Sequence, residues 1–406
     1  MIAFDQLFAA DLPSPAARWT GYPRYNFVGG HNDPEIVPVE GLMASAERVL
    51  RREGHKLATY HMGDGPLGHA GLRAFVADKL SMRGIETTGD DVLITSGSLQ
   101  GLDLVNEVLL QKGDTVIMEQ LTYSGAITRL QRRGVRIIGV PLDEQGLRTD
   151  LLAATLEDLR AQGVRPKYIY TIPTVQNPTA SVLSVERRQE LLRLSEAFGV
   201  PIFEDECYAD LLWEGEWPAA LRGMAGGGNV IHIGSFSKSL APALRLGYVS
   251  APWQVVSRLV ACKGDGGTPA IEQMIVADFF GEHFAAHVGR LKQRLRRKLE
   301  VLTGALEEQF GAAAEFAATS GGIFLWVTLP EQVDTQALAG PALEAGIAYN
   351  AGPEWSTDPE TARHSMRLCF ALPPEDEIRA GIARLAEVCH RETGVPERGA
   401  NLVRRA

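Results

Sequence analysis

A single lysine lies among small and hydroxylated residues after the strand-like run Asn229–Ile233. An amine at the carboxyl end of a strand, where ligands bind in open α/β sheets, has a lowered pKa when partly desolvated and can form an imine with an aldehyde. Lys238 is in this position, and Ser235, Ser237 and Arg245 offer the hydroxyls and charged fork that bind phosphate. An imine-forming lysine beside a phosphate site indicates pyridoxal 5'-phosphate (PLP). Taken alone, the stretch is also typical of an exposed Ser-Lys-Ser turn.

Four more polar positions suit the same cofactor. Small residues at 96–100 precede a predicted helix, whose N–H groups and positive end attract an anion. Tyr123 follows a strand and could stack on a flat ring, and Asn177 could donate its amide to a phenolic oxygen. Asp205 ends another strand, where a buried carboxylate could keep a pyridine nitrogen protonated. Each residue alone has an ordinary explanation, such as a helix start, packing or a turn cap.

Strand-like runs alternate with helical patterns from Asp91 to Ser250, which predicts βαβ units and a mainly parallel sheet covered by helices. After Thr268 come a long helix and a shorter mixture of strands and helices. We therefore expect an N-terminal arm over residues 1–45, a large domain over 46–285 and a small C-terminal α/β domain over 286–406. The predicted strands are 92–94, 115–118, 135–140, 168–172, 201–204, 230–233 and 246–250, and the clearest helices of the large domain are 99–110, 151–162 and 185–198.

The composition of the 406 residues is that of an ordinary globular protein, with 45% hydrophobic and 22% charged residues. A net charge of −10 argues against nucleic acid as a partner, and the basic run 291–302 is interpreted as the solvated face of an amphipathic helix. Four scattered cysteines predict reduced thiols and no metal site. Neither a signal peptide at Met1–Gln6 nor a bilayer-spanning run is visible, so a cytoplasmic protein without membrane contact is expected.

Together these motifs resemble the class I and II aminotransferases, which are fold-type I PLP enzymes, along nearly the whole chain. The run 235–247 resembles the family's lysine motif, Asn177-Pro-Thr its Asn-Pro-Thr-Gly motif, and Asp205 with Tyr208 its Asp-x-x-Tyr pair. The resemblance implies a large domain with a seven-stranded, mainly parallel sheet, a small α/β domain, and an arm that packs with the small domain.

The resemblance also implies a role for each matching residue. Lys238 would form the aldimine and, through a quinonoid, move the substrate's proton; Asp205 and Tyr208 would assist as catalytic residues. Arg367, Gly30 and Asn177 would bind the substrate, with Arg367 clamping its α-carboxylate. The implied cofactor-binding residues are Tyr60, Ser98, Leu99, Tyr123, Asn177, Asp205, Tyr208, Ser235, Ser237, Lys238 and Arg245.

Within the family the chain is most similar to α-aminoadipate aminotransferases and the effector domains of MocR-type regulators. That branch implies a homodimer in which Tyr60 reaches the partner's cofactor phosphate, while Gly29 and Gly30 let the arm lie close over the substrate. Several positions depart from the branch's pattern where substrate choice is expected to be made. They are His31, Asn32, Val175, Ala180 and Ala243.

The leading hypothesis is a PLP-dependent aminotransferase that moves an amino group from an L-amino acid to a 2-oxo acid. An alternative keeps the cofactor but eliminates or substitutes a β or γ group, or closes a ring; the unusual arm and Val175 motivate it. A third hypothesis is a ligand-sensing regulator domain. It is disfavoured because about 45 residues precede the first substantial helices, too few for a winged-helix module.

Overall fold

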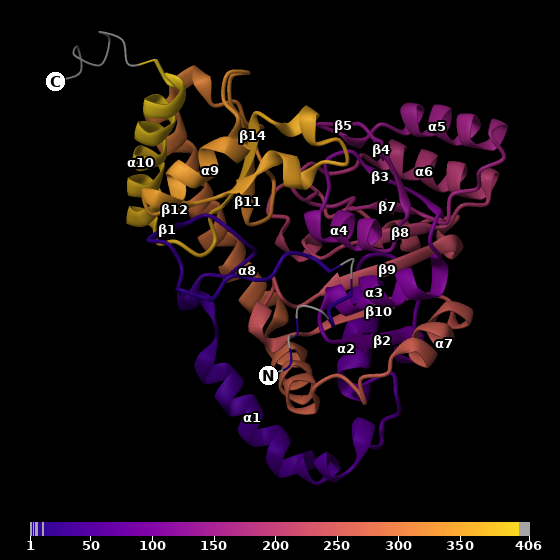
Figure 1. Ribbon diagram of the computed structural model, residues 1–406. Coiled ribbons are helices and arrows are strands. Elements are labelled where there is room, and N and C mark those ends of the chain that lie inside the picture. The colour runs from indigo at the N-terminus through magenta and orange to yellow at the C-terminus, as the bar shows by residue number, and fades with distance from the viewer. Residues whose placement is uncertain (1, 3, 5–6, 10–11, 398–406) are drawn as a thin grey trace.

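A seven-stranded sheet forms the centre of the computed structural model, which describes residues 2, 4, 7–9 and 12–397 (Figure 1). The strand order is β2-β10-β9-β8-β7-β3-β4, and β10 is antiparallel to both of its neighbours while the other pairs are parallel. This confirms the predicted sheet. Its strands are β2 (Val92–Thr95), β3 (Thr115–Glu119), β4 (Arg136–Val140), β7 (Ile169–Thr171), β8 (Ile202–Asp205), β9 (Val230–Ser235) and β10 (Gly247–Ser250).

Helices cover both faces of this sheet, so alternate strand residues are buried against different helices. On one face α3, α4 and α7 pack against residues such as Val116 and Ile231. On the other, α5 and α6 pack against residues such as Ile117, and α2 and α8 against residues such as Ile94. The helices are α2 (Ala70–Ser81), α3 (Ser98–Leu109), α4 (Ser124–Arg132), α5 (Thr149–Ala161), α6 (Val185–Phe198), α7 (Trp253–Cys262) and α8 (Ala270–Phe310). A short hairpin, β5 (Leu142–Asp143) and β6 (Gly146–Leu147), precedes α5.

Helix α6 begins and ends at the predicted residues because both of its ends carry local signals. The Ser184 hydroxyl accepts a hydrogen bond from the backbone N–H of Arg187 at 3.3 Å, which satisfies one of the first free N–H groups. Gly199 ends the helix in the left-handed region with φ +62°, where a side chain would be strained. Capping chemistry of this kind is readable from sequence alone.

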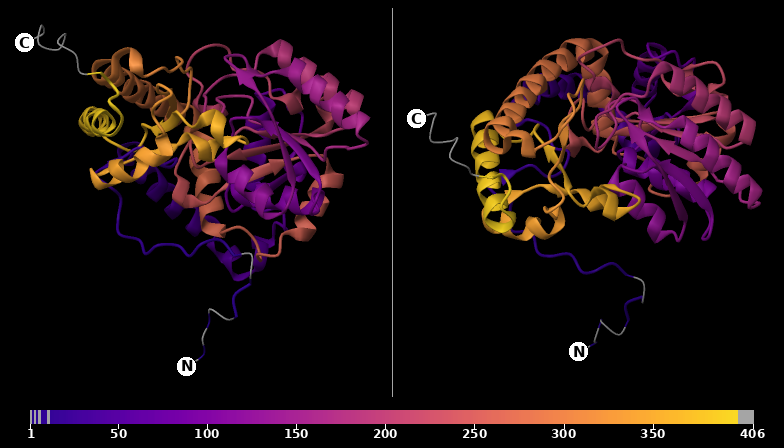
Figure 2. Two further views of the ribbon diagram at one scale, coloured as in Figure 1. Left: turned by 45° about the horizontal axis from the view of Figure 1, so that its top comes forward. Right: turned by 90° about the horizontal axis from the view of Figure 1, so that it is seen from above.

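The smaller body beside the sheet contains a three-stranded antiparallel sheet of order β11-β14-β13 (Figure 2). The arm joins it, because β1 pairs in parallel with β12. Its apolar core also includes the second half of α8. The elements are β1 (Tyr25–Asn26), β11 (Phe324–Thr328), α9 (Thr335–Glu344), β12 (Ile347–Ala348), β13 (Asn350–Ala351), β14 (Ser365–Cys369) and α10 (Glu375–Thr393).

The predicted domain limits fall within continuous helices. Helix α1 (Val39–Glu53) begins inside the predicted arm, and α8 runs without a break across the boundary at 285/286. The division into domains therefore stays a prediction. Its outer limits, residues 1 and 406, lie outside the described residues. Within the described part of the chain, the helices are all too short or too polar to cross a membrane.

Two helical glycines provide a test of the packing. A Cβ added at Gly101 in α3 would lie 2.7 Å from Ile233 Cδ1 and 2.9 Å from Val249 Cγ2, whereas one at Gly281 in α8 would meet nothing within 4 Å. Gly101→Ala should lower the free energy of unfolding by about 1 kcal/mol because overpacking exceeds the gain in helix propensity. Gly281→Ala should raise it by about 0.5–1 kcal/mol. Urea unfolding measures both, and changes of the same sign would contradict this packing.

Candidate active site

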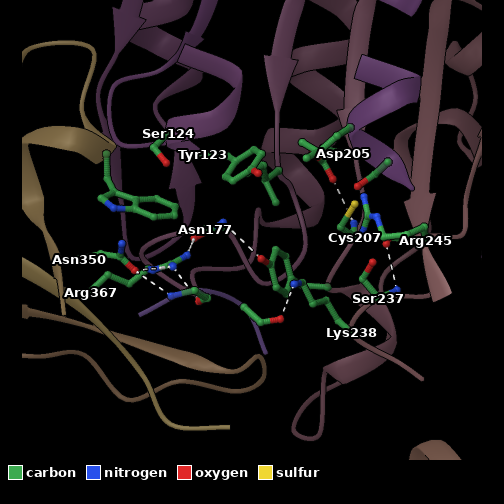
Figure 3. Close-up of a pocket in the computed structure, with 18 residues that line it drawn as sticks. Tyr123, Ser124, Asn177, Asp205, Cys207, Ser237, Lys238, Arg245, Asn350 and Arg367 are labelled. Atoms are coloured by element: carbon green, nitrogen blue, oxygen red, sulfur yellow. Dashed lines mark hydrogen bonds between the residues drawn. The ribbon is translucent and has the colours of Figure 1, made fainter. Parts of the chain in front are cut away.

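A cavity of about 300 Å³ lies at the edge of the sheet where the parallel strands end (Figure 3). It collects residues that follow β2, β3, β7, β8 and β9, as expected when the carboxyl ends of parallel strands share one edge. The arm and β13–β14 close its other side. All of the predicted site residues except Tyr60 line it, namely Gly30, Ser98, Leu99, Tyr123, Asn177, Asp205, Tyr208, Ser235, Ser237, Lys238, Arg245 and Arg367.

The Lys238 amine is buried in the middle of this cavity. It donates a hydrogen bond to the Gly30 carbonyl oxygen at 2.6 Å, and it lies 6.0 Å from the centre of the Tyr208 ring. Burial lowers the pKa of Lys238 to about 8, because desolvation disfavours the ammonium form. A substantial fraction of the amine is therefore neutral and nucleophilic near neutral pH.

On one side of the lysine lies Asp205 (Figure 3). Its carboxylate accepts from the Tyr170 hydroxyl at 2.7 Å and from the Cys207 backbone N–H at 3.1 Å. No cation among the described residues forms an ion pair with it, and burial raises its pKa above the ordinary value. A buried carboxyl group in this state is complementary to a cationic donor brought by a ligand. Nearby, the Asn177 amide donates to the Tyr208 hydroxyl at 3.4 Å.

At the other side lies Arg367, which is only 3% exposed. Its guanidinium donates to Asn177 Oδ1 at 3.0 Å, Asn350 Oδ1 at 2.8 Å and the Gly29 carbonyl oxygen at 2.9 Å. The Trp355 ring covers it at 3.6 Å from the ring centroid. Its Nε is buried and has no partner in the described part of the chain. This is a preorganised planar fork of the kind that binds carboxylates.

A third group of donors lies around the start of α3. The first N–H groups of this helix, at Ser98 and Leu99, have no intrahelical acceptor. Arg245 lies close against Gly97, which has φ +79° and leaves no room for a side chain. Ser237 lines the same end, and Ser235 accepts from its backbone N–H at 3.0 Å. Free N–H groups, hydroxyls and a guanidinium form a binding site for an anion.

The one predicted residue outside the cavity is Tyr60. Its side chain is 86% exposed and lines a separate depression with Gly266 and Thr268. Its contact with a partner's cofactor therefore stays a prediction.

The departures from the family pattern also lie away from the cavity wall. Val175 and Ala180 are buried residues with φ +56° and +60°, a region that non-glycine residues rarely occupy. Val175 packs against Gly321 and Gly322, which lie just before strand β11. Val175, one of the two observations that motivated an elimination reaction, is thus a packing feature. The Asn32 amide binds backbone carbonyls of the Lys238 turn.

Sequence reasoning missed several residues that line the cavity. Cys207 could have been found, because it lies between Asp205 and Tyr208 in one motif. Asn350 and Trp355 had no signal of their own, because only the antiparallel register that sets Asn350 opposite Arg367 brings them to the site. Ser124 and Ile172 were also missed, whereas Gly29, which the resemblance had placed over the substrate, lines the wall as well.

Comparison with known proteins identifies the fold and its chemistry. The family model described as aminotransferase class I and II matches residues 31–385. The chain belongs to this family. Aromatic-amino-acid aminotransferase 1 of Thermococcus litoralis is 32% identical over 90% of this chain and 88% of its own. The multiple substrate aminotransferase of Thermococcus profundus superimposes with TM-score 0.88 at 32% identity, covering 97% of this chain and 100% of the other.

A third relative bears on the cofactor of this aminotransferase. The α-aminoadipate aminotransferase of Thermus thermophilus, solved with N-(5'-phosphopyridoxyl)-L-leucine, has TM-score 0.82 and 31% identity over 90% of this chain and 92% of the other. The chain is a PLP-dependent enzyme, and its substrates are amino acids and 2-oxo acids. The cavity fits the cofactor, because a buried amine, a carboxylate without a cation and an anion site lie within it.

Behind the cavity, the buried Glu119 carboxylate joins β3 to the segment that carries Asn177. It accepts from Thr171 Oγ1 at 2.6 Å, from the Ile172 N–H at 3.2 Å and from Gln176 Nε2 at 3.0 Å. Burial raises its pKa from the ordinary 4.5 to about 7. Because Gln176 precedes Asn177, this carboxyl group supports one wall of the site.

Glu119→Gln should flatten the pH dependence of stability. The folded protein binds the Glu119 proton more tightly than the unfolded chain, so the parent's free energy of unfolding should fall as pH rises from 4.5 to 7. The contribution is on the order of 3 kcal/mol, and the amide removes it. Urea unfolding across this range measures the slope. The exposed Glu308→Gln in α8 should keep the parent's slope, and an unchanged slope in Glu119→Gln would contradict the raised pKa.

Proposed function

We propose that the transamination uses Lys238 as its base and as its covalent attachment to PLP. The observation that carries this proposal is the position of the buried Lys238 amine between Asp205 and Arg367 in one cavity. When bound, PLP supplies an aldehyde that condenses with amines and a ring that accepts the electron pair of a broken bond. The neutral Nζ can take the proton from the substrate's α-carbon, since burial keeps the pKa of Lys238 near 8.

The residues around Lys238 hold the cofactor in this proposal. Asp205 meets the ring nitrogen, because its carboxylate has no cation of its own among the described residues. Asn177 and Tyr208 donate to the phenolic oxygen, and Tyr123 lies against the ring. The phosphate is held by Ser98, the Leu99 N–H, Ser235, Ser237 and Arg245.

Arg367 is proposed to bind the substrate's α-carboxylate, together with Asn177 and the closely approaching Gly30. A carboxylate is a stronger acceptor than the amide and carbonyl oxygens that now accept from the guanidinium. The Trp355 ring covers the planar guanidinium and shields it from water. A carboxylate fixed by the fork leaves the α-carbon hydrogen one orientation relative to Lys238, which is how positioning lowers the barrier.

We further propose a cytoplasmic homodimer in which Tyr60 completes the phosphate site of the partner. The Tyr60 ring and the apolar side chains of Val39 and Met43 on α1 support this, because they are exposed to solvent in the single chain.

The substrate's side chain is proposed to be uncharged and flat. The cations that line the cavity in the described part of the chain are Lys238, Arg245 and Arg367, and each has a role above. A side-chain carboxylate would meet Trp355, Tyr123 and Ser124 without a cationic partner, which is costly in a desolvated site. The two aromatic rings, 6.0 Å apart between centroids, instead offer contact to an apolar ring.

L-Phenylalanine should therefore exceed L-aspartate in kcat/KM by at least about tenfold, since an unpaired buried carboxylate costs more than 1.4 kcal/mol. Steady-state kinetics with one 2-oxo acid acceptor measures the ratio. A higher kcat/KM for aspartate would show that a cation from elsewhere reaches the side chain.

The role of Lys238 is tested through its covalent bond to the cofactor. Addition of an amino acid should convert the PLP of the parent enzyme to pyridoxamine phosphate, which absorbance reports. Lys238→Ala should lack the bond that borohydride makes irreversible in the parent. Lys292→Ala is the matched control, because burial also lowers the pKa of Lys292 but it lies outside the cavity. A reducible bond retained in Lys238→Ala, or a parent whose PLP no amino acid converts, would contradict the proposal.

A further inference from the structure

The arm segment 29–33, called here the strap, contacts two of the charged groups of the site, Arg367 and Lys238. The Gly29 carbonyl accepts from Arg367, and the Gly30 carbonyl accepts from Lys238. Asp33 forms ion pairs with Lys298 at 2.7 Å and Arg294 at 2.9 Å on α8. The strap thus crosses from β14 to the lysine turn and on to α8.

At Gly30 the strap determines the orientation of the Lys238 amine. The described part of the chain offers Nζ one hydrogen-bond acceptor, the Gly30 carbonyl oxygen at 2.6 Å. A Cβ at Gly30 would lie against Nζ and displace the amine, so glycine at this position lets the Gly30 carbonyl and the lysine approach each other as observed. A neutral amine that donates one N–H to this carbonyl has its lone pair directed away from the strap and available to another proton.

Asn32 fixes this part of the strap to the turn that carries the lysine. Its side chain is buried, and its Nδ2 donates to the Leu240 carbonyl at 2.9 Å and to the Lys238 carbonyl at 3.4 Å. Both acceptors belong to the 238–240 turn, so the Gly30 carbonyl and the Lys238 amine are held to one rigid unit. An apolar residue at this position has no donor and could not form either bond.

We propose that Asn32 is a positioning residue for Lys238, which fixes the strap so that the Gly30 carbonyl orients the free amine for proton transfer. This inference rests on the proposed function, in which Lys238 is the base. Asp33 and Gly29 hold the strap to α8 and to Arg367. Among the described strap residues, Asn32 is the one whose side chain bonds the backbone of the lysine's own turn, so its effect should appear in the proton transfer rather than in substrate binding.

The test compares Asn32→Leu with Asn26→Leu in the full-length protein. Both change a buried asparagine of the arm, but in the described part of the chain the side chain of Asn26 bonds only within the arm, where its Oδ1 accepts from the Val28 N–H at 3.1 Å. Thermal unfolding checks that both variants fold. Hydrogen exchange of residues 30–36, with and without PLP, measures the strap. Steady-state kinetics with an amino acid deuterated at its α-carbon measures the proton transfer.

In Asn32→Leu we expect the backbone amides of the strap to exchange hydrogen about tenfold faster, because two buried hydrogen bonds are lost. The kcat should fall about tenfold to hundredfold with KM nearly unchanged, and the deuterium isotope effect on kcat should rise because proton transfer becomes slower than other steps. Asn26→Leu should keep the parent's kcat, isotope effect and strap exchange.

Three outcomes would overturn the proposal. A looser strap with an unchanged isotope effect would make Asn32 a structural anchor only. Equal effects in Asn32→Leu and Asn26→Leu would assign them to general destabilisation of the arm. Unchanged hydrogen exchange of the strap in Asn32→Leu would show that the Asn32 side chain does not fix the strap. Failure of the proposed function is distinct, because it would appear in the parent enzyme as absent turnover and not as a difference between variants.

Discussion

The burial of three charged groups within one small cavity governs the arrangement of this site. Lys238, Asp205 and Arg367 are each removed from water, and a buried charge is costly unless hydrogen bonds or an opposite charge compensate it. The protein compensates each group incompletely: one carbonyl for the lysine, a phenol and an N–H for the aspartate, amide oxygens for the arginine. The uncompensated charges of these three groups are complementary to a ligand that carries both positive and negative groups.

That incomplete compensation links the fold to the chemistry. The low polarity that raises the pKa of Asp205 also lowers the pKa of Lys238, so one environment prepares a carboxylate for a cationic ring and an amine for proton transfer. The sheet supplies Asp205 and Lys238, the small body supplies Arg367, and the arm bonds Lys238 and Arg367. Since these parts are far apart in sequence, the site depends on the packing of α8 and on the strap.

Most of the fold was predictable because its signals are local. The alternation of apolar runs gave the seven strands, and Ser184 and Gly199 marked the ends of α6. The catalytic motifs were predictable for a similar reason: each lies directly after a strand, and parallel strands present their carboxyl ends at one edge. Asn350 and Trp355 were not predictable, because their positions near Arg367 depend on how β13 and the segment after it pack against β14. The packing of Val175 and the hydrogen bonds of Asn32 could not be predicted either, since packing and side-chain direction are not local properties.

The sequence by itself therefore determined the cofactor and the order of the elements, and it predicted the base, through short motifs whose chemistry is local. Tertiary structure alone decided how those groups are paired: that the Gly30 carbonyl meets the Lys238 amine, that Asn32 holds the two together, and that Trp355 covers Arg367. The physical reason is that a hydrogen bond or a stacked ring needs two atoms within a few ångströms. Gly30 and Asn32 lie 208 and 206 positions before Lys238 and reach that distance only when the whole chain has folded.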